Sequence, residues 1–156
     1  MATGATVEER LIADVITTLE AISPAGGFNK SFAKVARQDR NAMTHPELPL
    51  AIVAQDGTTK DDDRLGLVVA TLRLVIVIVV NAKEAESWPT LLDLYTSDVE
   101  NALRASTQRG GLAVKTAITR GDTYDSDELG STYVVASQVL VEISFRHLYA
   151  DTTTAI

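Results

Sequence analysis

The most informative part of the sequence is one apolar stretch, LGLVVATLRLVIVIVVNA, at residues 65–82. It approaches the length of about 20 apolar residues that a membrane-spanning helix requires. However, Arg73 lies near its centre, where a charge is costly in a bilayer. Its apolar residues are also mostly β-branched, which favours a pleated sheet. The stretch therefore predicts a long strand at Leu67–Asn81 in a soluble protein that does not enter a membrane.

The two faces of this strand differ in polarity. Its even-numbered positions from 68 to 80 are all apolar, whereas the odd-numbered positions change from polar Thr71 and Arg73 to apolar Val75, Val77 and Val79. A strand with one solvated face should continue to alternate between apolar and polar residues. We therefore expect the second half of the strand to be covered on both faces, either by a helix or by another subunit.

Length and composition indicate a single globular domain. The chain has 156 residues, of which 46% are hydrophobic and 22% are charged. The formal net charge of −7 argues against nonspecific DNA wrapping, which requires a field of Lys and Arg. The chain has no cysteine, which excludes disulfides and thiolate metal sites, and its first residues do not resemble a secretory signal. We expect one domain at residues 1–150 and a flexible tail at 151–156.

Two segments have the periodicity of amphipathic helices. The first, at residues 7–22, begins with a capping-box pattern of Thr6 and Glu9 and is followed by a Pro- and Gly-containing turn. The second, at residues 87–106, has Thr90 and Asp93 as a plausible N-terminal cap pair. Arg104 and Arg109 would favour the negative end of its dipole.

The remaining apolar segments predict strands. They lie at residues 32–37, where a short helix is the alternative, and at 50–55, 112–120 and 138–146. Polar loops are expected at residues 56–64 and 121–131. The resulting order, α-β-β-β-α-β-β, predicts an α+β fold. Its mainly antiparallel sheet would have four to five strands, with two amphipathic helices packed on one face.

No residue pattern predicts catalysis. His45 and His147 lack a recognisable nucleophile or orienting partner, and the chain has no G-x-S-x-G motif or phosphate-binding loop. A strand residue with a satisfied ring is therefore the preferred interpretation of His147. We expect no enzyme activity, no catalytic or metal-binding residue and no cofactor.

The acidic loops match a calcium site only in part. Counted from Asp125, loop positions 3 and 6 are Asp127 and Gly130, but positions 5 and 12 are Leu129 and Ala136, which cannot supply the required ligands. The run of three aspartates at 61–63 is better explained as a solvated charge run. A basic cluster is interpreted as a solvated face or a subunit contact rather than a nucleic-acid site, and its members are Lys30, Lys34, Arg37 and Arg40.

The order of features resembles the tail terminator (tail completion) proteins of long-tailed bacteriophages. The resemblance rests on the N-terminal helix, the strand LPLAIVA at 48–54 after a Pro-rich loop, and an acidic loop before the long apolar strand. It continues with a helix containing LLDLY at 91–95 and a final strand ending VEISFRH at 141–147. These features cover nearly the whole chain, but they constitute a pattern rather than a diagnostic motif. Head–tail connector proteins of the phage neck have a similar pattern.

The resemblance implies an assembly function without catalysis. Tail terminators form a hexameric ring that binds the end of the growing tail tube, stops its polymerisation and joins the tail to the head. Implied partners are further copies of the chain, the tail tube protein and the neck proteins, and DNA passes through the lumen without specific binding. The protein would be assembled in the host cytoplasm and located in the virion.

Two groups of residues are candidates for these roles. The subunit interface would include Arg73, Val75, Val77, Val79, Lys34 and Arg37. Acidic loops facing the channel or the tube, which would repel DNA phosphates, would include Asp61, Asp62, Asp63, Asp122, Asp125, Asp127 and Glu128. The competing hypothesis is a monomeric or dimeric α+β binding module that uses its open sheet face for a ligand or a protein partner. A small hydrolase is a third and weaker alternative.

Overall fold

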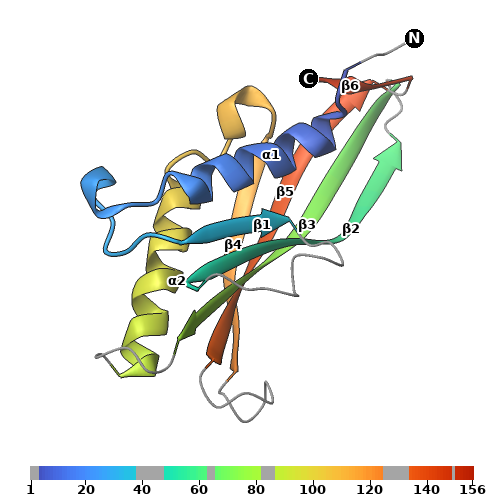
Figure 1. Ribbon diagram of the computed structural model, residues 1–156. Coiled ribbons are helices and arrows are strands. Elements are labelled where there is room, and N and C mark those ends of the chain that lie inside the picture. The colour runs from blue at the N-terminus through green and yellow to red at the C-terminus, as the bar shows by residue number, and fades with distance from the viewer. Residues whose placement is uncertain (1–3, 38–47, 63–65, 82–86, 125–133, 149) are drawn as a thin grey trace.

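The computed structural model describes residues 4–37, 48–62, 66–81, 87–124, 134–148 and 150–156 (Figure 1). Within these residues the chain forms an α+β fold with two α-helices and one six-stranded sheet. In chain order the elements are α1 (Val7–Glu20), η1 (Pro24–Gly26), β1 (Lys34–Arg37), β2 (Leu50–Asp62), β3 (Leu67–Asn81), α2 (Trp88–Arg104), η2 (Arg109–Gly111), β4 (Lys115–Tyr124), β5 (Val134–Leu148) and β6 (Asp151–Ala155).

The long apolar strand β3 lies at the centre of the sheet. The strand order is β1-β2-β3-β5-β4, and β6 pairs with β5. All pairings among these strands are antiparallel except that of β1 with β2. The prediction of a mainly antiparallel α+β fold is therefore confirmed, whereas the predicted four to five strands fall short of the observed six.

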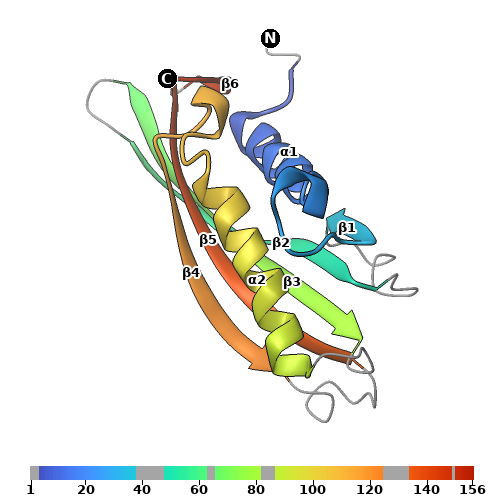
Figure 2. The ribbon, with the colours of Figure 1, turned by 90° about the vertical axis from the view of Figure 1, so that its left-hand side faces the viewer.

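Both helices cover the same side of a curled sheet (Figure 2). The even-numbered residues of β3 from Ala70 to Val80 point toward this side and are buried, together with the apolar stripes of α1 and α2. Complete burial of a Leu, Ile or Val side chain contributes about 1.5–3 kcal/mol. This helix-side core therefore supplies most of the hydrophobic stabilisation, and the opposite sheet face carries only a small second cluster.

The start of α1 makes half of the predicted capping box. Thr6 Oγ1 accepts a hydrogen bond from Glu9 N at 3.1 Å, as the sequence predicts. The Glu9 carboxylate does not return to the cap, because it pairs with Arg37 of β1 at 2.7 Å. The helix also ends at Glu20 rather than at residue 22. Glu9 thus links α1 to the edge of the sheet.

The predicted cap of α2 is wrong. Ser87 occupies the N-cap position and donates its hydroxyl hydrogen to Thr90 Oγ1 at 2.9 Å. Pro89 lies in the first turn, where its missing N–H is not needed. Asp93 instead reaches across to Arg120 of β4. The local pattern of Thr90 and Asp93 cannot show that Asp93 pairs with Arg120, because Arg120 lies 27 residues away along the chain.

Two strands extend into segments that the sequence assigns to loops. β2 continues to Asp62 and β4 to Tyr124, so residues 56–62 and 121–124 are not loops as predicted. Their backbone groups pair with the neighbouring strands β3 and β5, which outweighs their polar composition. Each extension contains a register shift, one between Gln55 and Thr58 and one between Arg120 and Thr123. At Gly57 the backbone has a φ of 95°, which favours glycine.

The C-terminal segment is part of the sheet. The prediction of a tail after residue 150 is corrected, because Asp151–Ala155 forms strand β6 on the edge of β5. Arg10 of α1 donates a hydrogen bond to the Thr153 carbonyl oxygen, and Ala155 packs against the helix-side core. Ile156 N also donates to Arg146 O at 3.2 Å. These contacts with distant residues leave no signature in a short polar sequence.

Two buried polar side chains connect loop segments to the helices through hydrogen bonds. Asp98 of α2 is 1% exposed, and its carboxylate accepts hydrogen bonds from the backbone N–H groups of Asn29 and Lys30. Arg109 is also 1% exposed; it donates to Leu103 O at 2.6 Å and to Ser106 O at 2.5 Å. These carbonyls lie at or after the end of α2, where the helix cannot satisfy its own acceptors.

Arg109 also connects the two helices. Its guanidinium lies 3.3 Å from the Asp14 carboxylate of α1. Burial lowers the pKa of Arg109, and Asp14 opposes that change. The expected position of Arg109 at the C-terminal end of α2 is thus confirmed, with a second role that the sequence does not show.

Replacing Arg109 with methionine should destabilise the protein by about 2–3 kcal/mol, because buried carbonyls lose their donors. Urea unfolding followed by circular dichroism measures this loss. Arg104→Met is the matched control, since Arg104 makes one exposed pair with Glu100 and should change the unfolding free energy by less than about 1 kcal/mol. Equal losses in the two variants would show that Arg109 does not fasten the helices.

The carboxylate of Asp151 should titrate at unusually low pH. Hydrogen bonds from the Thr153 hydroxyl, the Thr153 N–H and the Thr154 hydroxyl lower its pKa from 3.8 to about 2. A lowered folded-state pKa stabilises the fold above pH 3.8, and this contribution disappears as the pH falls through about 2. Thr153→Val should raise the pKa of Asp151 toward 3.8, as followed by NMR of its side-chain carbon. Thr152→Val should leave it unchanged, and an equal effect of both variants would contradict the assignment.

Candidate functional site

The candidate site is the sheet face that the helices leave open. The odd-numbered residues of β3 point to this outward face, including Arg73, Val75, Val77 and Val79. Val75 is the register partner of Ala54 in β2 and of Leu140 in β5. Leu140 is 39% exposed, whereas Val75 is half-buried. One exposed apolar side chain, Leu140, therefore lies beside the partly buried Val75 near the middle of the outward face.

Val77 and Val79 pack on this face against side chains of the neighbouring strands β1 and β2. Leu50 and Ile52 of β2 are 2% and 4% exposed, and they form a small cluster with Ala36. Leu48, Val77 and Val79 pack against this cluster. Val77 and Val79 thus have lateral apolar neighbours within their own sheet, and both stay partly exposed. Cover of this face by another subunit stays a prediction. The apolar surface still open to a partner is centred on Val75 and Leu140.

The other half of the outward face is polar and charged. Arg73 is the register partner of Glu142, and Val69 lies between Asp61 and Arg146. Val69 is 38% exposed, so its row presents an acidic, an apolar and a basic side chain on three neighbouring strands. The outward face thus changes from apolar to charged along β3, as the sequence pattern indicates.

The two basic residues predicted for the interface lie on opposite sides of β1. Lys34 is the register partner of Leu50 and lies exposed on the outward face. Arg37 lies on the helix side and donates two hydrogen bonds to the Glu9 carboxylate, at 2.7 and 2.9 Å. This pair lowers the pKa of Glu9 and raises that of Arg37. Arg37 is therefore engaged within the chain, and Arg40 lies outside the described residues.

The acidic residues predicted for two channel- or tube-facing loops lie on strands where the structure describes them. Asp61 and Asp62 are exposed residues of strand β2, where successive side chains point to opposite faces. They lie at the end of the β2–β3 pair that bends away from the helices (Figure 2). Asp122 is an exposed residue of β4 rather than of a loop. The remaining four, Asp63, Asp125, Asp127 and Glu128, lie outside the described residues.

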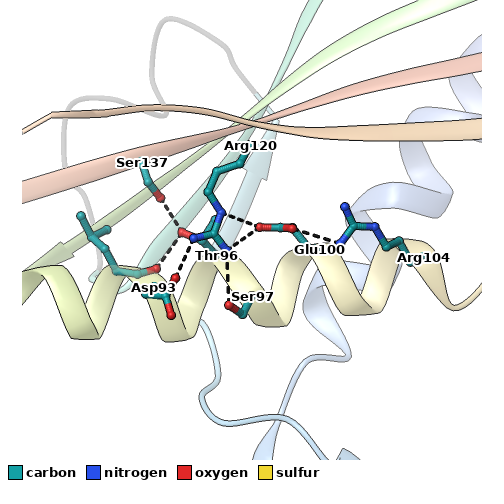
Figure 3. Close-up of polar contacts among 8 residues, drawn as sticks. Asp93, Thr96, Ser97, Glu100, Arg104, Arg120 and Ser137 are labelled. Carbon is teal, nitrogen blue, oxygen red and sulfur yellow. Dashed lines mark hydrogen bonds and ion pairs between the residues drawn. The ribbon is translucent and has the colours of Figure 1, made fainter.

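A polar network on the helix side joins β4 to α2 (Figure 3). Arg120 donates to Asp93 Oδ1 at 2.6 Å and to Glu100 Oε1 at 2.7 Å, and it reaches Ser97 Oγ at 3.3 Å. Glu100 also accepts from Arg104 at 3.0 Å. The hydrogen bond to Asp93 is the main cause that raises the pKa of Arg120. Two cations and two carboxylates thus neutralise one another on this surface.

His147 has the surroundings expected of a structural histidine. It is 2% exposed in β5; its Nδ1 lies 2.7 Å from Leu148 O and its Nε2 lies 3.5 Å from Lys60 Nζ. Because a carbonyl only accepts, Nδ1 carries the hydrogen and Nε2 accepts from Lys60. His45 lies outside the described residues. Over the described ranges, no group of three His, Asp or Glu side chains is arranged to hold a metal ion.

A scan against protein-family models and a search of curated proteins return no match to this chain. In the part of the chain that the structure describes, neither helix combines the length and the apolar character needed to cross a bilayer. The geometry of the outward face is therefore the main guide to function.

Proposed function

We propose that the protein is a structural component of a phage virion that forms a ring of subunits on the end of the tail tube. The ring stops polymerisation of the tube and joins the tail to the head or neck. The observation that carries this proposal is the exposed Leu140 beside the partly buried Val75, on the sheet face opposite α1 and α2 (Figure 2). The order of elements that resembles tail terminators supports it.

Association through this face has a clear physical origin. Leu140 is 39% exposed, and Val75 beside it is only half-buried. Full burial of an exposed side chain of this kind contributes about 1.5–3 kcal/mol, so burying the part still exposed here would contribute a fraction of that for each residue. In a closed ring each subunit would present this face to a different surface of the next subunit, which is a heterologous contact. Closure at six copies follows from the resemblance alone.

The acidic end of the β2–β3 pair suits a surface past which DNA moves. Asp61 and Asp62 are exposed, and the chain carries a net charge of −7. Carboxylates repel phosphates over about one Debye length, roughly 8 Å at physiological ionic strength. Such a lining would keep DNA from adhering while it passes through the lumen. Because the two side chains alternate in direction, Asp61 and Asp62 would face different neighbours.

The role proposed is structural, with no catalysis and no cofactor, and with the tail tube and the neck proteins as partners. The nearest alternatives are another connector protein of the neck and a monomeric or dimeric binding module that uses the same face. A binding module would not need the tail tube, so its oligomeric state would not change when tail tubes are added.

Light scattering across a concentration series, with and without short tail tubes from the same phage, should detect a closed ring of subunits. Leu140→Glu should prevent ring formation, because it places a charge in the apolar contact. Val114→Glu is the matched control, since Val114 is 46% exposed but lies outside β3 and β5, which form the contact. The control should still assemble. A monomer that ignores tube ends at every concentration would exclude the proposal and favour the binding module.

Charge reversal at the end of β2 tests the lumen role separately. The double variant Asp61→Lys and Asp62→Lys should fold and form rings but reduce phage infectivity, because DNA would adhere to the lumen. A plaque assay in complemented infection measures this effect, with Asp56→Lys as a control in the same strand. Unchanged infectivity of the double variant would show that this end of β2 does not line the DNA path.

A further inference from the structure

A pocket opens between the first turns of α2 and the strands β4 and β5, on the helix side of the sheet. Its volume is about 240 Å³. Trp88, Pro89 and Leu92 form apolar walls, and the hydroxyls of Thr96 and Ser137 lie deepest, in residues only 2% and 3% exposed. Asp93, Arg120 and Thr123 are exposed and surround the mouth. The site is thus an apolar chamber with a polar floor.

The volume limits the size of a ligand. Pockets for drug-sized molecules measure about 300–1,000 Å³, which is larger than this one. A protein cavity of about 150 Å³ holds one benzene molecule. A chamber of about 240 Å³ therefore accommodates a single substituted ring rather than a nucleotide or a fused cofactor.

The hydrogen bonds of Thr96 and Ser137 at the base of the pocket determine which polar group a ligand must carry there. Thr96 donates its only hydroxyl hydrogen to Leu92 O at 2.7 Å. Ser137 Oγ lies 2.8 Å from Thr96 Oγ1, so Ser137 must be the donor in that contact (Figure 3). Ser137 Oγ then keeps lone pairs that can only accept. A ligand that reaches this floor must supply a hydrogen-bond donor.

The charged residues at the mouth of the pocket indicate whether a ligand would be charged or neutral. Arg120 is paired with both Asp93 and Glu100, and Glu100 is paired in turn with Arg104. The two cations balance the two carboxylates, so the mouth offers no net charge to attract an ion. The apolar walls, which include an indole, favour a neutral aromatic ring.

We propose that this pocket binds one phenol group, the chemistry of a tyrosine side chain. The aromatic ring contacts Trp88 and Leu92, and its hydroxyl donates a hydrogen bond to Ser137 Oγ. The inference is independent of ring assembly, because the pocket lies on the helix side of the sheet and the proposed subunit contact lies on the outward face.

Trp88 is the only tryptophan in the chain, so its fluorescence reports directly on the pocket. Titration with p-cresol, excited where tryptophan alone absorbs, should change the emission with millimolar affinity. Toluene has the same ring without the donor and should bind roughly three- to tenfold more weakly. Ser137→Ala should weaken p-cresol binding by a similar factor without affecting toluene. Ser144→Ala, on the outward face of the same strand, should bind p-cresol as the wild type does.

A second variant keeps the test decisive if Ser137→Ala does not fold. Thr123→Phe places a larger side chain at the exposed mouth and should abolish p-cresol binding. Equal affinity for p-cresol and toluene, or binding unaffected by both variants, would overturn the proposal.

A blocked Gly-Tyr-Gly peptide distinguishes the two possible sources of the phenol group. Binding of the peptide indicates a tyrosine of a partner protein, and binding of p-cresol alone indicates a small free phenol.

Discussion

The rest of the structure depends on the antiparallel pairing of β3 with β5. The two strands are in continuous register from Leu67 opposite Leu148 to Asn81 opposite Val134, without a bulge. This uninterrupted ladder fixes which side chains point toward the helices, because a shift of one residue would reverse every one of them. The even-numbered residues of β3 and the odd-numbered residues of β5 then form the sheet surface against which α1 and α2 pack. Register shifts occur in the pairing of β2 with β3 and of β4 with β5, but not in this central pair.

The same constraint divides the sheet into two structurally different sides. On the helix side, ion pairs and buried polar groups tie the elements together: Arg109 joins the helices, Arg120 joins β4 to α2, and Glu9 joins α1 to β1. Within the described residues, both α-helices lie on the other side, and the outward face carries the small cluster around Leu50 and Ile52. The proposed subunit contact uses the outward face, and the proposed recognition of a small group uses the pocket beside α2.

Local patterns predicted the elements that apolar periodicity controls. The bounds of β3, the alternation in β5 and the positions of both helices within two residues follow from such patterns. The extension of β2 to Asp62 and the strand β6 did not follow, because their polar residues are held by backbone pairing with strands elsewhere. The site was predictable to a similar degree. The break in alternation marked Val75, Val77 and Val79 as apolar residues of the outward face, and their place in an interface stays a prediction. The pocket was missed because Thr96 and Ser137, which line it, are 41 residues apart in the sequence.

Charge explains why the proposed assembly would need an apolar contact. The chain carries 21 acidic and 14 basic residues, so copies of it repel one another at long range. Several arginines are already paired within the chain, among them Arg37, Arg109 and Arg120, and a pair satisfied internally offers little to a neighbour. In the proposed assembly, the attraction between copies would then come from surface that loses water on contact. Around Val75 the register partner Leu140 provides such a surface, next to the charged row of Arg73 and Glu142 that can orient the neighbour. An apolar centre beside a polar rim is the arrangement through which an acidic protein can associate in one orientation.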